Sequence, residues 1–201
     1  MVVVVTLPTH ADLRHGIANW LPLGNLGYGD CTIAAYEHIN MIHNLATTSW
    51  WKRLAYRIGY QPPSNAYAIS EYAAYLATVG EKPSPVNGVN PDDFLAWEQK
   101  QGRVNSYQFY PTTTANASDT IREVMLQWNG CMVGLLLTER AYEAQGAWVL
   151  EPGDTPSINL AHAVAMVAYS NDMNGIVTWG KMKEMTVEFA NATVYGCWGW
   201  S

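Results

Sequence analysis

Residues 25–35 have the sequence Asn-Leu-Gly-Tyr-Gly-Asp-Cys-Thr-Ile-Ala-Ala, which places a cysteine where a glycine-rich loop meets a predicted helix. The apolar side chains after Cys31 recur at helical spacing, and Asp30 is a candidate to cap the helix. Cys31 then lies in the first helical turn, where free N–H groups and the helix dipole favour an anion. A thiol in that position tends towards the thiolate, which is the nucleophilic form. The sequence therefore makes Cys31 a candidate nucleophile, against the alternative of a buried structural cysteine.

The composition is that of a globular protein. The chain has 201 residues, of which 49% are hydrophobic and 14% are charged, enough for one domain or two closely packed lobes. Its formal net charge is -6, which argues against nucleic acid or an anionic membrane as the main partner. Because the aromatic content is high, a contact surface for a protein neighbour is a second interpretation beside core packing.

The cysteines and the apolar segments bear on where the protein works. Three cysteines make a disulfide framework unexpected, and no secretory signal is recognisable. The longest apolar run, residues 131–137, fits a buried strand and is too short for a membrane span. Residues 1–5 are interpreted as a short strand. We therefore expect a cytoplasmic protein, or one carried inside a virion that assembles in a cytosol.

The periodicity changes along the chain from helical to strand-like. Helices are predicted for residues 31–45, 70–79, about 91–101 and 118–128, and strands for residues 131–137, 161–169 and 176–179, with residues 187–195 part helix and part strand. This order predicts an α+β protein with a cleft between two lobes, which is a usual place for a site.

His162 is the histidine best placed to act with Cys31. It opens an apolar strand in the other half of the chain, where a polar ring must find a partner or face a cleft. A thiolate needs a base to hold its proton, and an imidazole can do this. The alternative is a histidine with a purely structural role.

Several segments together resemble the papain-like cysteine peptidases. The Cys31 loop matches, and the run His162-Ala-Val-Ala-Met-Val-Ala-Tyr169 is similar to the histidine block of that family. Asn25 stands six residues before the cysteine, where the family has the glutamine of the oxyanion hole. The Asp-Cys pair is closer to the bacteriocin-processing (C39-type) peptidases of the same fold, and the loop and the Trp-Gly segment are similar to uncharacterised papain-like proteins of bacteria and phages.

The resemblance implies a papain-like fold. A helical N-terminal lobe, about residues 20–128, is then packed on a C-terminal lobe with an antiparallel sheet, about residues 131–201 plus an N-terminal strand, in a single domain of residues 1–201. It also implies roles for three residues: Cys31 as nucleophile, His162 as base, and the amide of Asn25 with the Cys31 N–H as oxyanion hole.

One departure from the family concerns the group that orients the histidine. The family has Asn-Ser-Trp-Gly, and this chain has Val177-Thr178-Trp179-Gly180. Valine cannot orient an imidazole, so Thr178, or Asn174 from the preceding turn, would have to do so. Loss of an orienting group usually lowers a rate without abolishing the chemistry.

Two functions follow as alternatives. The first is a cysteine hydrolase acting on a peptide, a peptidoglycan cross-bridge or an isopeptide, with no cofactor and no metal. The second is a weak or inactive protein of the same fold with a structural or binding role in a phage virion or capsid. The second is favoured by Val177 and by the absence of a recognisable inhibitory pro-segment, and the aromatic tail, residues 195–200, would then dock against a protein neighbour.

Overall fold

The computed structural model describes residues 7–46 and 63–201, so the predicted strand at residues 1–5 lies outside the described residues. Within these ranges there are six α-helices and one antiparallel sheet of seven strands. The helices are α1 (Cys31–Ala46), α3 (Asn65–Thr78), α4 (Pro91–Lys100), α5 (Ala117–Trp128), α6 (Glu139–Glu143) and α7 (Val187–Thr193). The strands are β1 (Ala11–Asp12), β2 (Tyr107–Pro111), β3 (Cys131–Leu136), β4 (Ala161–Tyr169), β5 (Met173–Thr178), β6 (Lys181–Thr186) and β7 (Val194–Trp200).

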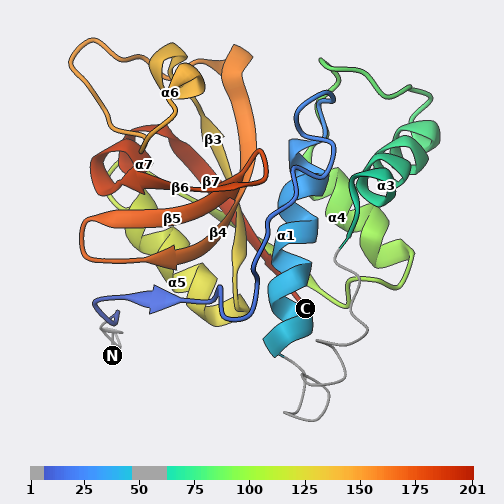
Figure 1. The fold of residues 1–201 in the computed structure, drawn as a ribbon, viewed down its shortest axis with the longest axis horizontal. Coiled ribbons are helices and arrows are strands. Elements are labelled where there is room, and N and C mark those ends of the chain that lie inside the picture. Colours follow the sequence, from blue (N-terminus) through green and yellow to red (C-terminus); the bar gives the residue numbers. More distant parts are fainter. Residues whose placement is uncertain (1–6, 47–62) are drawn as a thin grey trace.

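The elements form two parts that lie side by side (Figure 1). One part is the sheet, with the strand order β2-β7-β3-β4-β5-β6 and with β1 paired to β4. The other part contains α1, α3 and α4, and α1 is the helix that packs against β4. The α+β class and the antiparallel sheet predicted from the sequence are therefore confirmed.

Helix starts follow local capping chemistry. The Asn90 side chain accepts hydrogen bonds from Asp92 N and Asp93 N at the start of α4, as its Asn-Pro sequence suggests. Helix α3 begins at Asn65, five residues before the predicted start, because the Ser64 side chain accepts a hydrogen bond from Tyr67 N. The hydrophobic periodicity of this segment is weak, so it did not reveal the true start of the helix. The serine at position 64 was the residue that could have indicated it.

The aromatic C-terminal tail was predicted to be a docking surface, and this prediction is wrong. Residues 194–200 form β7, which lies between β2 and β3 inside the sheet. Trp198 and Trp200 are each 2% exposed, and only Tyr195 of this tail remains substantially accessible. The tail is aromatic because it is a core strand, and its indoles fill the space beneath α1 and α4.

Helix α5 packs on the sheet and on the short helix α7, on the side away from the helical part. Its main contacts are with β7, α7, β3 and β4, and its side chains join the hydrophobic cluster of Val133, Val164 and Met166. The lobe expected to span residues 20–128 included this helix, since only the helical pattern was visible in the sequence. We propose that the boundary between the lobes lies before β2, because β2 already pairs with β7.

Alternation along β4 divides the core between its two faces. Ala163, Ala165 and Val167 belong to the cluster shared with α1, whereas Val164 and Met166 face the cluster shared with α5. The small alanines allow α1 to approach the strand closely. This packing brings the first turn of α1 to the start of β4.

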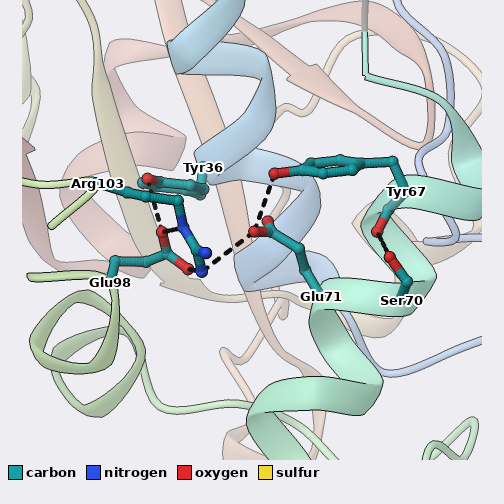
Figure 2. A network of polar contacts seen from close by, with 6 residues as sticks. All are labelled: Tyr36, Tyr67, Ser70, Glu71, Glu98 and Arg103. Atoms are coloured by element: carbon teal, nitrogen blue, oxygen red, sulfur yellow. Dashed lines mark hydrogen bonds and ion pairs between the residues drawn. The ribbon is translucent and has the colours of Figure 1, made fainter. Parts of the chain in front are cut away.

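Two buried glutamates, Glu71 and Glu98, meet around one arginine in the helical part (Figure 2). Arg103 forms an ion pair with Glu98 at 2.6 Å and with Glu71 at 3.3 Å, and Tyr36 of α1 donates a hydrogen bond to Glu98. Glu37, on α1 beside this group, also meets Glu71, and burial raises its pKa to about 9. Glu98 is fully buried, and Arg103 is its ion-pair partner.

We predict that Arg103→Met lowers the free energy of unfolding by about 3–5 kcal/mol at neutral pH, because it leaves a buried carboxylate without its partner. Chemical denaturation followed by tryptophan fluorescence measures this. Arg140→Met is the matched control, since Arg140 pairs with Asp154 while 61% of its own side chain is exposed, and we expect a loss below about 1 kcal/mol. Equal losses for the two variants would contradict the role given to Arg103.

Asp30 does not cap α1 with its side chain, contrary to the sequence-based expectation. Its backbone oxygen accepts from Ala34 N, but both carboxylate oxygens are buried without a hydrogen-bond partner among the described residues. The carboxyl lies against Gly24, whose φ is +94° and where an added Cβ would lie 2.1 Å from Asp30 Oδ2. Burial raises the pKa of Asp30 to about 7.

We predict that Asp30→Asn becomes progressively more stabilising as the pH rises. The raised pKa means that the folded protein holds a proton that the unfolded chain releases, so wild type loses stability from about pH 4 up to pH 7. Relative to the variant, this loss amounts to up to about 4 kcal/mol between pH 4 and pH 8. Thermal unfolding of both proteins across this range measures it, and a difference independent of pH would disprove it.

No helix in the described part of the chain is both long and apolar enough to cross a membrane.

Candidate active site

Cys31 lies in the first turn of α1, at the point where the helix meets β4. The residue is half-buried, and its sulfur is close enough to Ala163 to accept a hydrogen bond from that backbone N–H. Ala163 is the residue after His162, so the thiol lies near the strand position that carries the base predicted from the sequence. The contact resolved for the thiol is with the strand backbone and not with the imidazole ring.

The expected shift of the Cys31 thiol towards the thiolate is not found in the free protein. Burial raises the pKa of Cys31 above its ordinary value, and the neighbouring Asp30 raises it further. The hydrogen bond from Ala163 acts in the opposite direction but is the smaller effect. Desolvation outweighs the helix terminus here because the sulfur is covered by the sheet.

His162 stands at the start of β4 with its ring fixed on three sides. Its Nε2 lies 2.7 Å from Thr178 Oγ1. The ring stacks on the Trp179 indole at 4.9 Å and 22°, and it meets the edge of Trp148 at 6.5 Å. Burial lowers the pKa of His162 to about 4, and the positive charge of Lys183 adds to this effect. The imidazole is therefore neutral at physiological pH.

The alternation of β5 explains why Thr178 and not Val177 meets the histidine. Val177 is buried in the cluster shared with α1, and the next side chain points to the other face of the strand, where His162 lies. Asn174, the other residue considered for this task, is engaged elsewhere. It is fully buried and forms hydrogen bonds with Ser118 and Arg122.

The turn after β5 holds the indole of Trp179 against His162. Thr178 pairs with Lys181, so Trp179 and Gly180 form a two-residue hairpin loop, and both have positive φ, 49° and 72°. These are the signs of a type I′ turn, in which tryptophan is unusual at the first position. Gly180 also lies against the backbone of residues 20–22, where an added Cβ would meet Pro22 N at 2.6 Å. The turn thus fixes the loop before α1 to the strand that carries Thr178.

Asn25 lies in that loop and is almost completely buried. Its backbone N–H donates to Pro22 O, and the neighbouring Leu23 N–H donates to the Asn65 side chain. Asn25 lines a pocket of about 410 Å³ together with Thr178 and Trp179. The structure thus brings three of the four sequence-predicted residues together, with His162 on Thr178 and Asn25 beside Thr178. The fourth, Cys31, lies by Ala163 at the start of β4.

Lys183 is a residue of this region that sequence reasoning missed. It lies on β6 with its ammonium 5.3 Å from the Trp148 ring and 5.4 Å from the Trp179 ring, and it donates a hydrogen bond to Ala144 O. The available signal was the alternation Lys-Met-Lys-Glu-Met in residues 181–185, which marks a strand with both lysines on one face.

The other candidate groups are accounted for by the core. Cys131 and Cys197 are buried, and His38 is buried with its Nε2 on Leu21 O. Across the described ranges, no group of three or more histidine, cysteine or acidic side chains is arranged to hold a metal ion.

Comparison with known proteins finds similarity in structure. No protein-family model matches the sequence, and a search among curated proteins finds no significant match. Xylellain, a cysteine protease of Xylella fastidiosa, matches with a TM-score of 0.65 and 13% identity, over 98% of this chain and 87% of the other. A digestive procathepsin L 3 of Tenebrio molitor matches with a TM-score of 0.63 and 10% identity, over 98% of this chain and 72% of the other.

The ragweed pollen allergen Amb a 11, a cysteine protease in its proform, matches with a TM-score of 0.62 and 11% identity, over 98% of this chain and 66% of the other. These similarities cover nearly all of the chain and agree with the α+β architecture described above. At such low identity they establish the fold alone. The chain has the papain-like cysteine peptidase fold.

Proposed function

We propose that the protein is a cysteine hydrolase that cleaves an amide bond with Cys31 and His162. The observation that carries the proposal is the junction of α1 and β4, where the Cys31 sulfur contacts Ala163 N–H while the ring of the preceding residue is fixed by Thr178 and Trp179. A ring with one nitrogen on a hydroxyl, one face stacked on an indole and a second indole edge-on is pre-oriented for proton transfer.

In the proposed reaction, Nε2–H of His162 donates to Thr178 Oγ1, which leaves the lone pair on Nδ1 as the base. Nδ1 takes the thiol proton while the Cys31 sulfur attacks the carbonyl carbon. The Asn25 amide and the Cys31 N–H stabilise the oxyanion. The imidazolium then protonates the leaving nitrogen as the C–N bond breaks, and water hydrolyses the thioester, which restores the thiol.

The pKa values favour a neutral thiol and a neutral imidazole in the free protein. The raised pKa of Cys31 and the lowered pKa of His162 both disfavour a resting ion pair. His162 therefore acts as a general base during the attack. This arrangement is consistent with a slow hydrolase that is little active towards its surroundings before substrate binds.

We predict that Cys31 reacts with an electrophilic acyl-type thiol probe at neutral pH and that His162→Ala lowers the labelling rate by about 100-fold or more. Mass spectrometry of the labelled protein measures the rate and the site. Cys31→Ala is the matched control, because Cys131 and Cys197 remain as buried thiols. Labelling of Cys31 that is unchanged in His162→Ala would sink the hydrolase proposal and favour a binding protein with this fold.

Thr178 is proposed as a positioning residue for His162. We predict that the isosteric Thr178→Val lowers the Cys31 labelling rate by about tenfold, since the ring loses its partner, and that Thr178→Ser stays near wild type. In wild type the rate should rise with pH through neutrality, because the thiol pKa is raised and a neutral imidazole is available above about pH 4.

The pH profile separates positioning from a general loss of stability. In Thr178→Val the profile should move towards that of His162→Ala, whereas a loosened fold would only scale the wild-type curve. Identical profiles and rates in Thr178→Val and wild type would contradict the positioning role.

A further inference from the structure

The pocket beside Thr178 and Trp179 has a charge unlike that of the rest of the chain. It measures about 410 Å³, and its lining residues are Asn25, Leu26, Tyr142, Ala144, Gln145, Thr178, Trp179, Lys181 and Lys183. This lining includes two lysines and no carboxylate, although the chain as a whole has 17 acidic and 11 basic residues. A locally cationic cavity in an acidic protein is a selective place for an anion.

The two lysines converge on the pocket from one strand. Lys181 and Lys183 are two residues apart on β6, so their side chains leave the same face. Lys181 is exposed, whereas Lys183 is half-buried over the Trp148 and Trp179 rings. Burial and the charge of Lys181 lower the pKa of Lys183, which means that the two ammonium groups repel each other. An anion between them relieves that repulsion.

Lys183 is held in place and still has donors to offer. One N–H bond of its ammonium is directed to Ala144 O, and an ammonium has three donors. The packing on two indoles fixes the stem and the head of the side chain, so little rotamer freedom remains to be lost on binding. Lys183 is thus a pre-organised cation in the lining of the cavity, together with the exposed Lys181.

The position of the pocket relative to His162 determines which part of a substrate enters it. In the proposed function, on which this inference rests, the acyl group is attached to Cys31 and the imidazolium gives its proton to the leaving nitrogen. The leaving group must therefore lie beside the His162 ring. Thr178 and Trp179, which contact that ring, also line the pocket, so the pocket adjoins the ring.

We propose that this pocket binds the leaving-group portion of the substrate and that Lys181 and Lys183 select a carboxylate there. The carboxylate is either an acidic side chain close after the scissile bond or the free C-terminus of a short leaving peptide. Both sources present the same planar anion to the two ammonium groups. A charge-assisted hydrogen bond to each lysine favours the carboxylate over its neutral amide by about tenfold or more.

Three matched peptides with one acyl portion test the proposal. Their leaving portions carry glutamate with an amidated C-terminus, glutamine with an amidated C-terminus, and glutamine with a free C-terminus. We expect kcat/KM to be about tenfold higher for at least one carboxylate peptide than for the fully amidated glutamine peptide. The peptide that gains identifies the source of the carboxylate. Equal values for all three peptides would overturn this inference and leave the hydrolase intact.

The lysine variants assign the preference to the pocket. Lys181→Gln should reduce the preference to within about threefold, and Lys181→Glu should invert it, with the effects weakening at high salt. Lys100→Gln is the matched control, because it removes the same charge from the exposed end of α4. The double variant Lys181→Gln/Lys183→Gln is first shown to be folded by its thermal unfolding transition. A carboxylate preference that survives in it would disprove the assignment.

Binding to Cys31→Ala separates this inference from the proposed function. The same three peptides are titrated into that variant, and tryptophan fluorescence reports binding. Tighter binding of a carboxylate peptide, without cleavage of any peptide by wild type, would support the pocket and contradict the hydrolase. No preference in either binding or cleavage would overturn the inference directly.

Discussion

The close packing of α1 on β4 is the contact on which the candidate site depends. Small side chains at Ala163 and Ala165 allow the helix to approach, and the Cys31 sulfur reaches the backbone N–H of Ala163. The same contact covers the thiol and raises its pKa, so positioning and activation oppose each other at this point. A nucleophile held in this way depends on a neighbouring base during the attack, and not on a lowered pKa of its own.

The hairpin of β5 and β6 supplies the second half of the site. Its two-residue turn places Trp179 on the His162 ring while the last residue of β5 offers a hydroxyl to the ring nitrogen. The left-handed backbone at a tryptophan is costly for a side chain with a Cβ. The surrounding structure offsets this cost through stacking on His162 and edge contacts with Trp148 and Tyr142. Strained backbone conformations are common at sites where a side chain must be held in one orientation.

In this protein a threonine hydroxyl contacts the histidine ring, where the family pattern has an asparagine amide. In the Asn-Ser-Trp-Gly pattern the residue two before the tryptophan carries the amide, and in this chain that position is a valine buried against α1. The neighbouring threonine lies on the opposite face of β5, which is the face of His162. The hydrogen-bonding partner of the ring is therefore the residue that follows the valine.

The sequence by itself determined the helix that begins at Cys31, the strand that begins at His162 and the α+β class, because local periodicity and capping residues carry that information. Periodicity did not reveal that Trp198 and Trp200 are core residues, since an aromatic run looks the same on a surface as in a central strand. Only the tertiary structure decided which nitrogen, hydroxyl and ammonium groups meet. Those meetings, and the desolvation that sets the pKa of Cys31, arise between segments far apart in the chain, where no local pattern records them.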